Sequence, residues 1–220
     1  MSKLIRNHYR VLLIYFLLLF FGFLILLNQG KADIHLFVNQ LNHPIADTFF
    51  KYITHLGDGL FSVAVIIALL FFSKRNSLMQ FMAFISSGLL VQVLKRFVFK
   101  GSLRPVAFFE GIAELHLVEG VKIARLHALP SGHTATAFAL FFCLIFTTRN
   151  RVLQAFYLFL ALITGYSRMY LSQHFLPDVL LGSLIGVALA LLSVWAVGKI
   201  NSENIDLPVY KSRRSVGPRV

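Results

Sequence analysis

Residues 11–28 read VLLIYFLLLFFGFLILLN, an apolar run that contains no charged residue. The hydrocarbon core of a bilayer is about 30 Å thick and needs about 20 helical residues to cross it. The run is longer than the apolar core of a typical signal peptide, and no small-residue cleavage site follows it. It therefore predicts a membrane-spanning helix.

Similar runs recur along the chain, so the same reasoning extends outward from this helix. We expect six spans, at residues 11–28, 58–73, 78–97, 130–148, 151–168 and 176–198. The composition agrees, because 57% of residues are hydrophobic and 14% are charged, against roughly 25% charged in an average soluble domain. The predicted fold class is all-α: an integral membrane bundle of six transmembrane helices, with residues 1–220 forming one domain.

Basic residues between the spans predict how the chain is oriented, because Lys and Arg near span ends are retained in the cytoplasm. If the N-terminus is cytoplasmic, the following basic residues all fall inside: Lys3, Arg6, Arg10, Lys74, Arg75, Arg149, Arg151, Lys199, Lys211, Arg213 and Arg214. Residues 201–220 then form a basic cytoplasmic tail. The outer connection 98–129 breaks the rule, since it also carries basic residues, and a functional role is the natural explanation.

The net charge of +12 admits a nucleic-acid partner in principle. The basic residues lie in short clusters between apolar runs, however, which favours the lipid bilayer as the partner and argues against nucleic acid. Cys143 is the only cysteine and lies in an apolar run, so it is expected to serve packing.

Two connections have recognisable patterns. Residues 114–126, ELHLVEGVKIARL, alternate apolar and polar residues around Glu119-Gly120, which predicts a two-stranded hairpin. Residues 31–57 are expected to form a partly helical loop before the second span.

Four polar clusters are expected at the outer ends of the last four spans. They are Lys95-Arg96, Arg104-Pro105, PSGH at 130–133 and SRMYLSQHFLPD at 167–178. Ionisable groups at membrane depth are costly and mark functional sites. Because the topology brings these clusters to one face of one bundle, we expect a single site there.

The PSGH segment has the features of an anion site at a helix N-terminus. Pro130 suits the first helical position, and the following residues then present free backbone amides that bind phosphate. Ser131 adds a hydroxyl, Gly132 permits close approach of the backbone, and His133 adds an imidazole. A simple helix cap is the alternative for this segment taken alone.

His174 and Asp178 are four residues apart at the start of the last span, so they share one helical face. Asp178 can fix the tautomer of His174 and leave the other ring nitrogen free as a nucleophile. His133 would then protonate the departing lipid oxygen as general acid. Since no DxD or HExxH motif is present, we expect no metal and no cofactor, and cationic side chains must neutralise the phosphate.

The cations suited to this task are Arg168 and Arg104, with planar forks that match phosphate oxygens, and Lys95, with a point charge. For each one alone, a juxtamembrane residue that reaches the interface is the alternative reading. Their assembly beside two histidines favours a site.

These residues together resemble the three-part signature of the type 2 phosphatidic acid phosphatase superfamily. The matching elements are Lys95 with Arg104-Pro105, then Pro130-Ser131-Gly132-His133, then Ser167-Arg168 with His174 and Asp178.

The resemblance implies metal-independent phosphohydrolysis with His174 as nucleophile, Asp178 as its partner and His133 as acid. It also implies that Lys95, Arg104, Ser131, Gly132 and Arg168 bind phosphate. The family usually has six residues between the lysine and Arg-Pro, whereas Lys95 is separated from Arg104 by eight. An insertion in the loop accommodates this difference, and Arg96 or Lys100 is the alternative lysine equivalent.

The expected function is a membrane lipid phosphatase acting through a phosphohistidine, with its site facing the periplasm or outside of a bacterial inner membrane. Undecaprenyl diphosphate, lipid A phosphates, phosphatidylglycerophosphate and phosphatidic acid all fit as substrate. A lipid-to-lipid phosphotransferase on the same scaffold is the nearest alternative, and a transporter or lipid-binding protein is the alternative from another class. The remaining histidines are interpreted as interfacial or loop residues: His8, His35, His43, His55, His116 and His127.

Overall fold

The computed structural model describes residues 1–200, so the predicted basic tail 201–220 lies outside the described residues. The elements in chain order are α1 (Ser2–Asn7), α2 (Tyr9–Gln40), α3 (Pro44–Ile53), the 3₁₀ helix η1 (Thr54–Gly57), α4 (Gly59–Phe72), α5 (Lys74–Val93), the π-helical turn η2 (Leu94–Val98), α6 (Pro105–Phe108), α7 (Gly132–Thr147), α8 (Arg151–Tyr170) and α9 (Leu176–Gly198).

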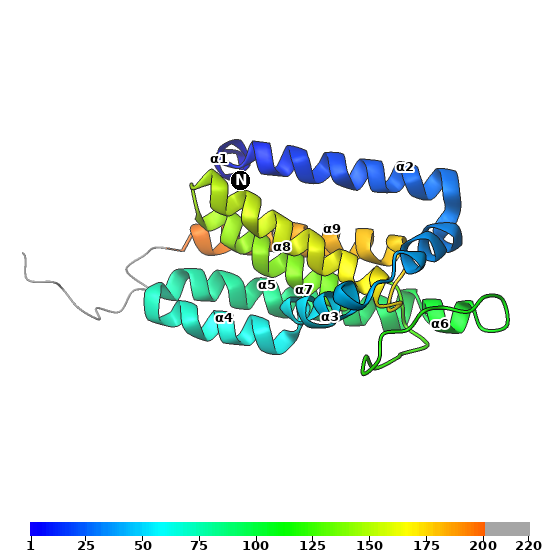
Figure 1. Ribbon diagram of the computed structural model, residues 1–220. Coiled ribbons are helices and arrows are strands. Elements are labelled where there is room, and N and C mark those ends of the chain that lie inside the picture. Colours follow the sequence, from blue (N-terminus) through cyan, green and yellow to red (C-terminus); the bar gives the residue numbers. More distant parts are fainter. Residues whose placement is uncertain (201–220) are drawn as a thin grey trace, which may run out of the picture.

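The long helices run side by side as one bundle (Figure 1). Four of them are individually long and apolar enough to cross a membrane: α2, α5 with η2, α8 and α9. The pair formed by α3–η1 and α4 qualifies as a fifth span when taken together, with a bend of 55° between its two parts. The apolar helix α7 has 16 residues. The prediction of an all-α membrane bundle is therefore confirmed.

Helix α7 lies inside the bundle, and two glycines of α9 set how closely the two helices pack. A Cβ added at Gly182 would lie 2.6 Å from the carbonyl oxygen of Ser131, and one added at Gly186 would lie 2.5 Å from that of Ala135. Small residues four apart let helix backbones approach closely in membranes. This contact places the start of α7 beside the start of α9.

Helix α2 extends twelve residues past the predicted end of the first span, and it changes direction at Gly30, whose φ is 76°. Beyond this break, Ile34, His35 and Val38 are buried against the rest of the protein, which explains why the helix continues. The expected loop at 31–57 is thus mostly helix, because α3 and η1 follow almost at once.

The predicted hairpin at 114–126 is wrong: apart from a single bridge between Leu103 and Leu126, this segment has no strand pairing. Its backbone bonds to side chains of the bundle instead. Asn39 bonds both the amide and the carbonyl of His116, Lys51 donates to Glu119 O, and Gln173 donates to Lys122 O. Only the turn at Glu119-Gly120 is as expected.

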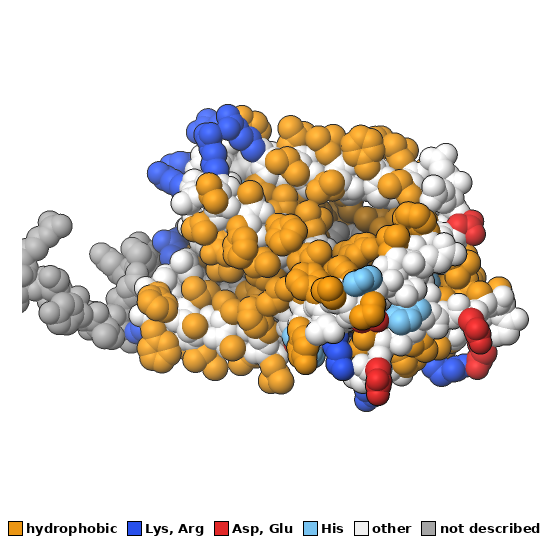
Figure 2. All heavy atoms as spheres, in the orientation of Figure 1, with side chains coloured by type: hydrophobic (Ala, Val, Ile, Leu, Met, Phe, Trp, Pro, Cys, Tyr) orange, Lys and Arg blue, Asp and Glu red, His pale blue; other side chains and the backbone are white. Residues whose placement is uncertain are grey.

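The two ends of the bundle differ in charge. Hydrophobic side chains cover the flank, and charged ones gather at the ends (Figure 2). We call the end with residues 99–131 and 171–175 the site end, and the end with Met1 and Gly198 the opposite end. Within residues 1–200, all acidic residues lie at or near the site end: Asp33, Asp47, Asp58, Glu110, Glu114, Glu119 and Asp178.

Candidate active site

His174 and Asp178 form a buried pair at the site end. His174 lies in the loop 171–175 between α8 and α9, and its Nδ1 is 3.2 Å from Oδ2 of Asp178. The same oxygen accepts the Phe175 amide at 3.0 Å, which caps α9. The two side chains are 1% and 5% exposed. A carboxylate can only accept from Nδ1–H, so Nε2 keeps its lone pair.

The loop that carries His174 is held in an uncommon conformation. Ser172 has a φ of 52°, and its hydroxyl lies 3.2 Å from both His35 Nε2 and Asn39 Nδ2. Such backbone persists only where surrounding contacts fix it, and it clusters at functional sites. The second part of α2, which carries His35 and Asn39, therefore positions the His174 loop.

Two arginines, Arg168 and Arg104, lie near the His174–Asp178 pair. Arg168 is 6% exposed, its Nη1 donates to Thr54 Oγ1 at 2.5 Å, and its buried Nε has no hydrogen-bond partner in the described chain. Arg104 donates through Nε to Leu126 O at 3.0 Å and through Nη1 to Gln173. Burial lowers the pKa of Arg104, and the Asp178 carboxylate opposes that shift. A buried guanidinium with an unused donor is suited to an anion.

The environment keeps His174 neutral. Burial, followed by the positive charges of Arg104, Arg168 and Lys95, lowers the pKa of His174 well below its ordinary value of 6.5. A neutral imidazole is the nucleophilic form.

This electrostatic effect also favours Lys95 as the lysine of the signature, since Arg96 and Lys100 are exposed. Lys95 lies in the π-helical turn η2, where the Phe99 amide bonds Leu94 O at 2.8 Å. A π turn accommodates an extra residue and often occurs at functional sites. Part of the extra length between Lys95 and Arg104 therefore lies in the π-helical turn, whereas we expected all of it in the loop.

At PSGH the helix begins later than predicted. Ser131 is the cap of α7 and Pro130 precedes it, so the placement of Pro130 at the first helical position is wrong. The hydroxyl of Ser131 accepts from the amide of Thr134 at 3.4 Å and from its Oγ1 at 2.8 Å, which makes it the capping group. Its own amide donates to Asp178 O at 2.9 Å, which joins the two motifs. The amides of Gly132 and His133 have no carbonyl partner among the described residues, as expected at a helix N-terminus.

His133 has an acidic partner that sequence reasoning missed. Its Nε2 lies 2.6 Å from Oδ1 of Asp58, and the other Asp58 oxygen lies 2.6 Å from Nδ1 of His55. A Cβ at Gly57 would be 2.7 Å from His133 O, so only glycine allows this approach.

Asp58 stands at the bend between η1 and α4. In the sequence, Gly57-Asp58 stands where the predicted loop 31–57 meets the predicted span 58–73, and this position is the one signal for Asp58. His55, interpreted as a loop residue, is exposed but shares this carboxylate.

His116 serves a contact between elements of the fold. His116 Nε2 lies 2.9 Å from Asp47, whose other oxygen accepts from the Tyr170 hydroxyl at 2.6 Å, joining α3 to α8. Among residues 1–200, no three His, Cys, Asp or Glu side chains are grouped so as to hold a metal ion. The expectation of a metal-free site stays a prediction.

Taken together, the site end offers a neutral imidazole on His174, the buried Arg168, the half-buried Arg104 and Lys95, and free amides at the start of α7, together with the second imidazole of His133. Such a set of groups can bind a tetrahedral anion such as phosphate and accept its phosphoryl group on the imidazole. The structure thus brings the predicted residues to the same end of the bundle and adds Thr54 and Asp58 to them.

Comparison with known proteins agrees with this arrangement. The family model described as PAP2 superfamily matches residues 76–202. A lipid A 4'-phosphatase of Bacteroides thetaiotaomicron is 34% identical over 86 residues, which are 39% of this chain and 38% of that protein. The match thus spans well under half of that relative's length.

Two solved structures share the fold. LpxE from Aquifex aeolicus superposes with a TM-score of 0.67 and 27% identity, over 75% of this chain and 94% of that one. A phosphatidylglycerolphosphate phosphatase of PAP2 type from Bacillus subtilis gives a TM-score of 0.65 and 24% identity, over 92% and 99%. Since the family model covers more than half of the sequence, including the PSGH and His174 motifs, the chain belongs to the PAP2 superfamily.

Proposed function

We propose that this protein is a membrane lipid phosphatase that removes phosphate from a phosphomonoester or diphosphate headgroup through a phosphohistidine on His174. The observation that carries the proposal is the buried His174–Asp178 pair beside Arg168 and Arg104, with a pKa of His174 well below 6.5. Relatives whose names describe them as lipid A 4'-phosphatase and phosphatidylglycerolphosphate phosphatase support the substrate class.

In the first step, Nε2 of His174 attacks phosphorus, and the bond from phosphorus to the lipid oxygen breaks. Asp178 accepts the hydrogen bond of Nδ1–H and stabilises the positive charge that forms on the ring. The protonated ring of His133 gives its proton to the leaving oxygen. Asp58, hydrogen-bonded to His133, orients that ring.

In the second step, water attacks the phosphohistidine, and the neutral His133 takes a proton from it. Inorganic phosphate leaves, and His174 and His133 return to their starting states. Arg168, Arg104, Lys95 and the amides after Ser131 stabilise the charge on the phosphoryl oxygens in both steps.

An apolar groove between α2 and α9 supports a membrane-embedded substrate. Its volume is about 630 Å³. The lining residues are Phe16, Leu19, Phe20, Phe23, Leu26, Leu129, Pro177, Leu180, Leu181 and Leu184. Leu129 and Pro177 are direct neighbours of Pro130 and Asp178 in the sequence. A lipid tail in this groove would hold its phosphate near His174, which raises the effective concentration at the site.

The proposed orientation places the site end outside a bacterial inner membrane. The basic residues of the opposite end support it, since positive charge is retained in the cytoplasm. A cysteine introduced at an exposed site-end position and labelled from outside in intact cells tests this orientation.

Phosphate release by the detergent-purified protein, in the presence of EDTA, tests the activity. The panel is undecaprenyl diphosphate, lipid A, phosphatidylglycerophosphate and phosphatidic acid, with His174→Ala as the inactive variant and His127→Asn as a matched control at the same end. We expect release that needs His174, and a base-stable phosphorylated protein in wild type only. Equal release by wild type and His174→Ala would disprove the mechanism, and a new phosphorylated lipid without free phosphate would show a transferase instead.

A further inference from the structure

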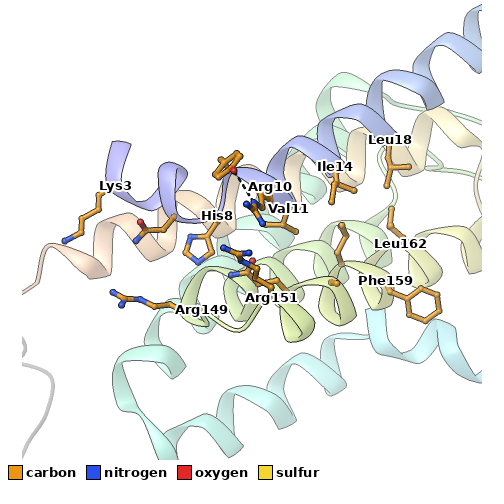
Figure 3. A pocket seen from close by; sticks show the side chains of 15 residues that line it. Lys3, His8, Arg10, Val11, Ile14, Leu18, Arg149, Arg151, Phe159 and Leu162 are labelled. Atoms are coloured by element: carbon orange, nitrogen blue, oxygen red, sulfur yellow. Dashed lines mark hydrogen bonds between the residues drawn. The ribbon is translucent and has the colours of Figure 1, made fainter.

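A second cavity lies at the opposite end of the bundle, far from His174. It opens between the start of α2 and the start of α8 and has a volume of about 700 Å³ (Figure 3). One wall is apolar: Val11, Ile14 and Leu18 come from α2, and Leu158, Phe159 and Leu162 come from α8. This volume lies in the range of cavities that enclose a small-molecule ligand.

The remaining lining is basic. Lys3, Arg10, Arg149 and Arg151 all line this cavity, and Figure 3 shows Arg10 and Arg151 projecting into the space between the two helices. In the part of the chain that the structure describes, none of the four is in an ion pair, and no acidic residue lines the cavity. Among residues 1–200, their charges thus have no acidic counterion.

The entrance of this cavity is formed by segments that lie far apart in the sequence. His8 contacts Leu4 O at 2.9 Å and Thr148 O at 3.2 Å, and Gln154 donates to the same Thr148 oxygen at 2.9 Å. These bonds fix the corner between α1 and α2 against the connection from α7 to α8. Arg10 is therefore held near Arg149 and Arg151 by folded structure.

Ordinary juxtamembrane cations do not explain this arrangement. Such residues need only reach the headgroup layer, each on its own helix. Here cations from two segments line one hollow whose inner wall is apolar. An apolar hollow beside lipid is favourable when hydrocarbon fills it, since close packing restores the lost dispersion contacts.

We propose that this cavity binds one anionic phospholipid, with its phosphate among Arg10, Arg149 and Arg151 and the upper part of an acyl chain along the apolar wall. The lipid would join α2, most of whose first half is exposed, to α8. Basic residues close to a membrane surface attract anionic lipid headgroups. The inference does not depend on the proposed catalytic function.

Native mass spectrometry of the full chain in detergent, with phosphatidylglycerol or phosphatidylcholine added, tests the proposal. Arg149→Gln/Arg151→Gln removes charge from the cavity, and Ala155→Trp fills it without changing charge. Arg6→Gln/Lys74→Gln is the matched control, because it removes the same charge from the same end outside the cavity. Any lipid bound at the catalytic site is common to all variants, so differences between them report on this cavity.

We expect both cavity variants to retain phosphatidylglycerol about tenfold less than wild type, and the control to stay within about twofold of it. Phosphatidylglycerol should also raise the melting temperature of wild type and control, but not of the cavity variants. Equal retention of the two lipids by wild type would overturn the proposal. Loss in the charge variant with full retention in Ala155→Trp would overturn the cavity as the site, since surface attraction alone then explains binding.

Discussion

The site end and the opposite end both collect cations, yet they differ in what faces those cations. At the site end, carboxylates bond several of the basic groups: Asp47 with His116, Asp58 with His133 and His55, and Glu110 with Arg125. At the opposite end, the cavity cations have no acidic partner among residues 1–200.

This difference in acidic partners indicates which cations are available to bind a ligand. Within residues 1–200, Arg104 and Arg168 form no ion pair with a carboxylate although the site end is rich in acidic residues, and they lie near His174. Within residues 1–200, the arginines of the opposite end likewise have no acidic partner, but no histidine–aspartate pair like His174–Asp178 lies beside them, so we expect this end to bind an anion without transforming it. Five measurements challenge or refine this comparison.

The largest effect is expected for Asp178→Asn. Asparagine cannot stabilise the charged ring of phosphorylated His174, so kcat/KM should fall by roughly 10³- to 10⁴-fold. The release assay described above measures this. Asp33→Asn is the matched control, because Asp33 is exposed on α2 near the same end, and its activity should remain close to wild type. Similar losses in both variants would mean that negative charge at this end, and not the pair with His174, matters.

The next effect separates the two ends directly. Arg168→Gln removes a buried donor at the site, and kcat/KM should fall by roughly 10²- to 10³-fold, as for the loss of one transition-state donor. Arg151→Gln makes the same chemical change at the opposite end and should alter kcat/KM by less than about twofold. A comparable loss in Arg151→Gln would show that the two ends are coupled.

Asp58→Asn should have a smaller effect, because Asp58 acts through His133. Loss of a hydrogen bond to a charged group lowers kcat/KM by about 10- to 100-fold. The loss should be greatest for lipids with a poor leaving group and small for an aryl phosphate, which needs little help from an acid. A uniform loss for all substrates, or an altered melting temperature, would indicate a purely structural role.

The smallest effect concerns pH. Since the pKa of His174 is held well below 6.5, the nucleophile stays neutral in mild acid, and the acid limb of kcat/KM that it sets should lie below pH 6.5. Arg104→Gln removes the largest charge contribution and should move that limb to higher pH. An unchanged limb in Arg104→Gln would show that another group controls it.

The same shift links pH to stability. Unfolded His174 binds a proton near pH 6.5, whereas the folded residue does not, so the unfolded state gains protons first. Stability from this residue is present above pH 6.5 and is lost as pH falls below it. A melting curve of wild type beside His174→Gln measures the difference.

The membrane bundle could be predicted from the amino-acid sequence, because apolar runs long enough to cross a bilayer are recognised without tertiary information. The PSGH segment and the His174–Asp178 pair could also be recognised from the sequence as parts of the site. Each motif is local, and the four-residue spacing of His174 and Asp178 follows from helix geometry.

Other features needed the tertiary structure. The hairpin prediction failed because the backbone of 114–126 bonds to Asn39, Lys51 and Gln173, and alternation along the chain cannot reveal distant side-chain partners. Asp58 was missed for the same reason, since only the close approach at Gly57 brings it to His133. The break at Gly30 and the glycine contacts of α9 decided which segments meet, because contacts between residues far apart in the chain depend on how the helices pack.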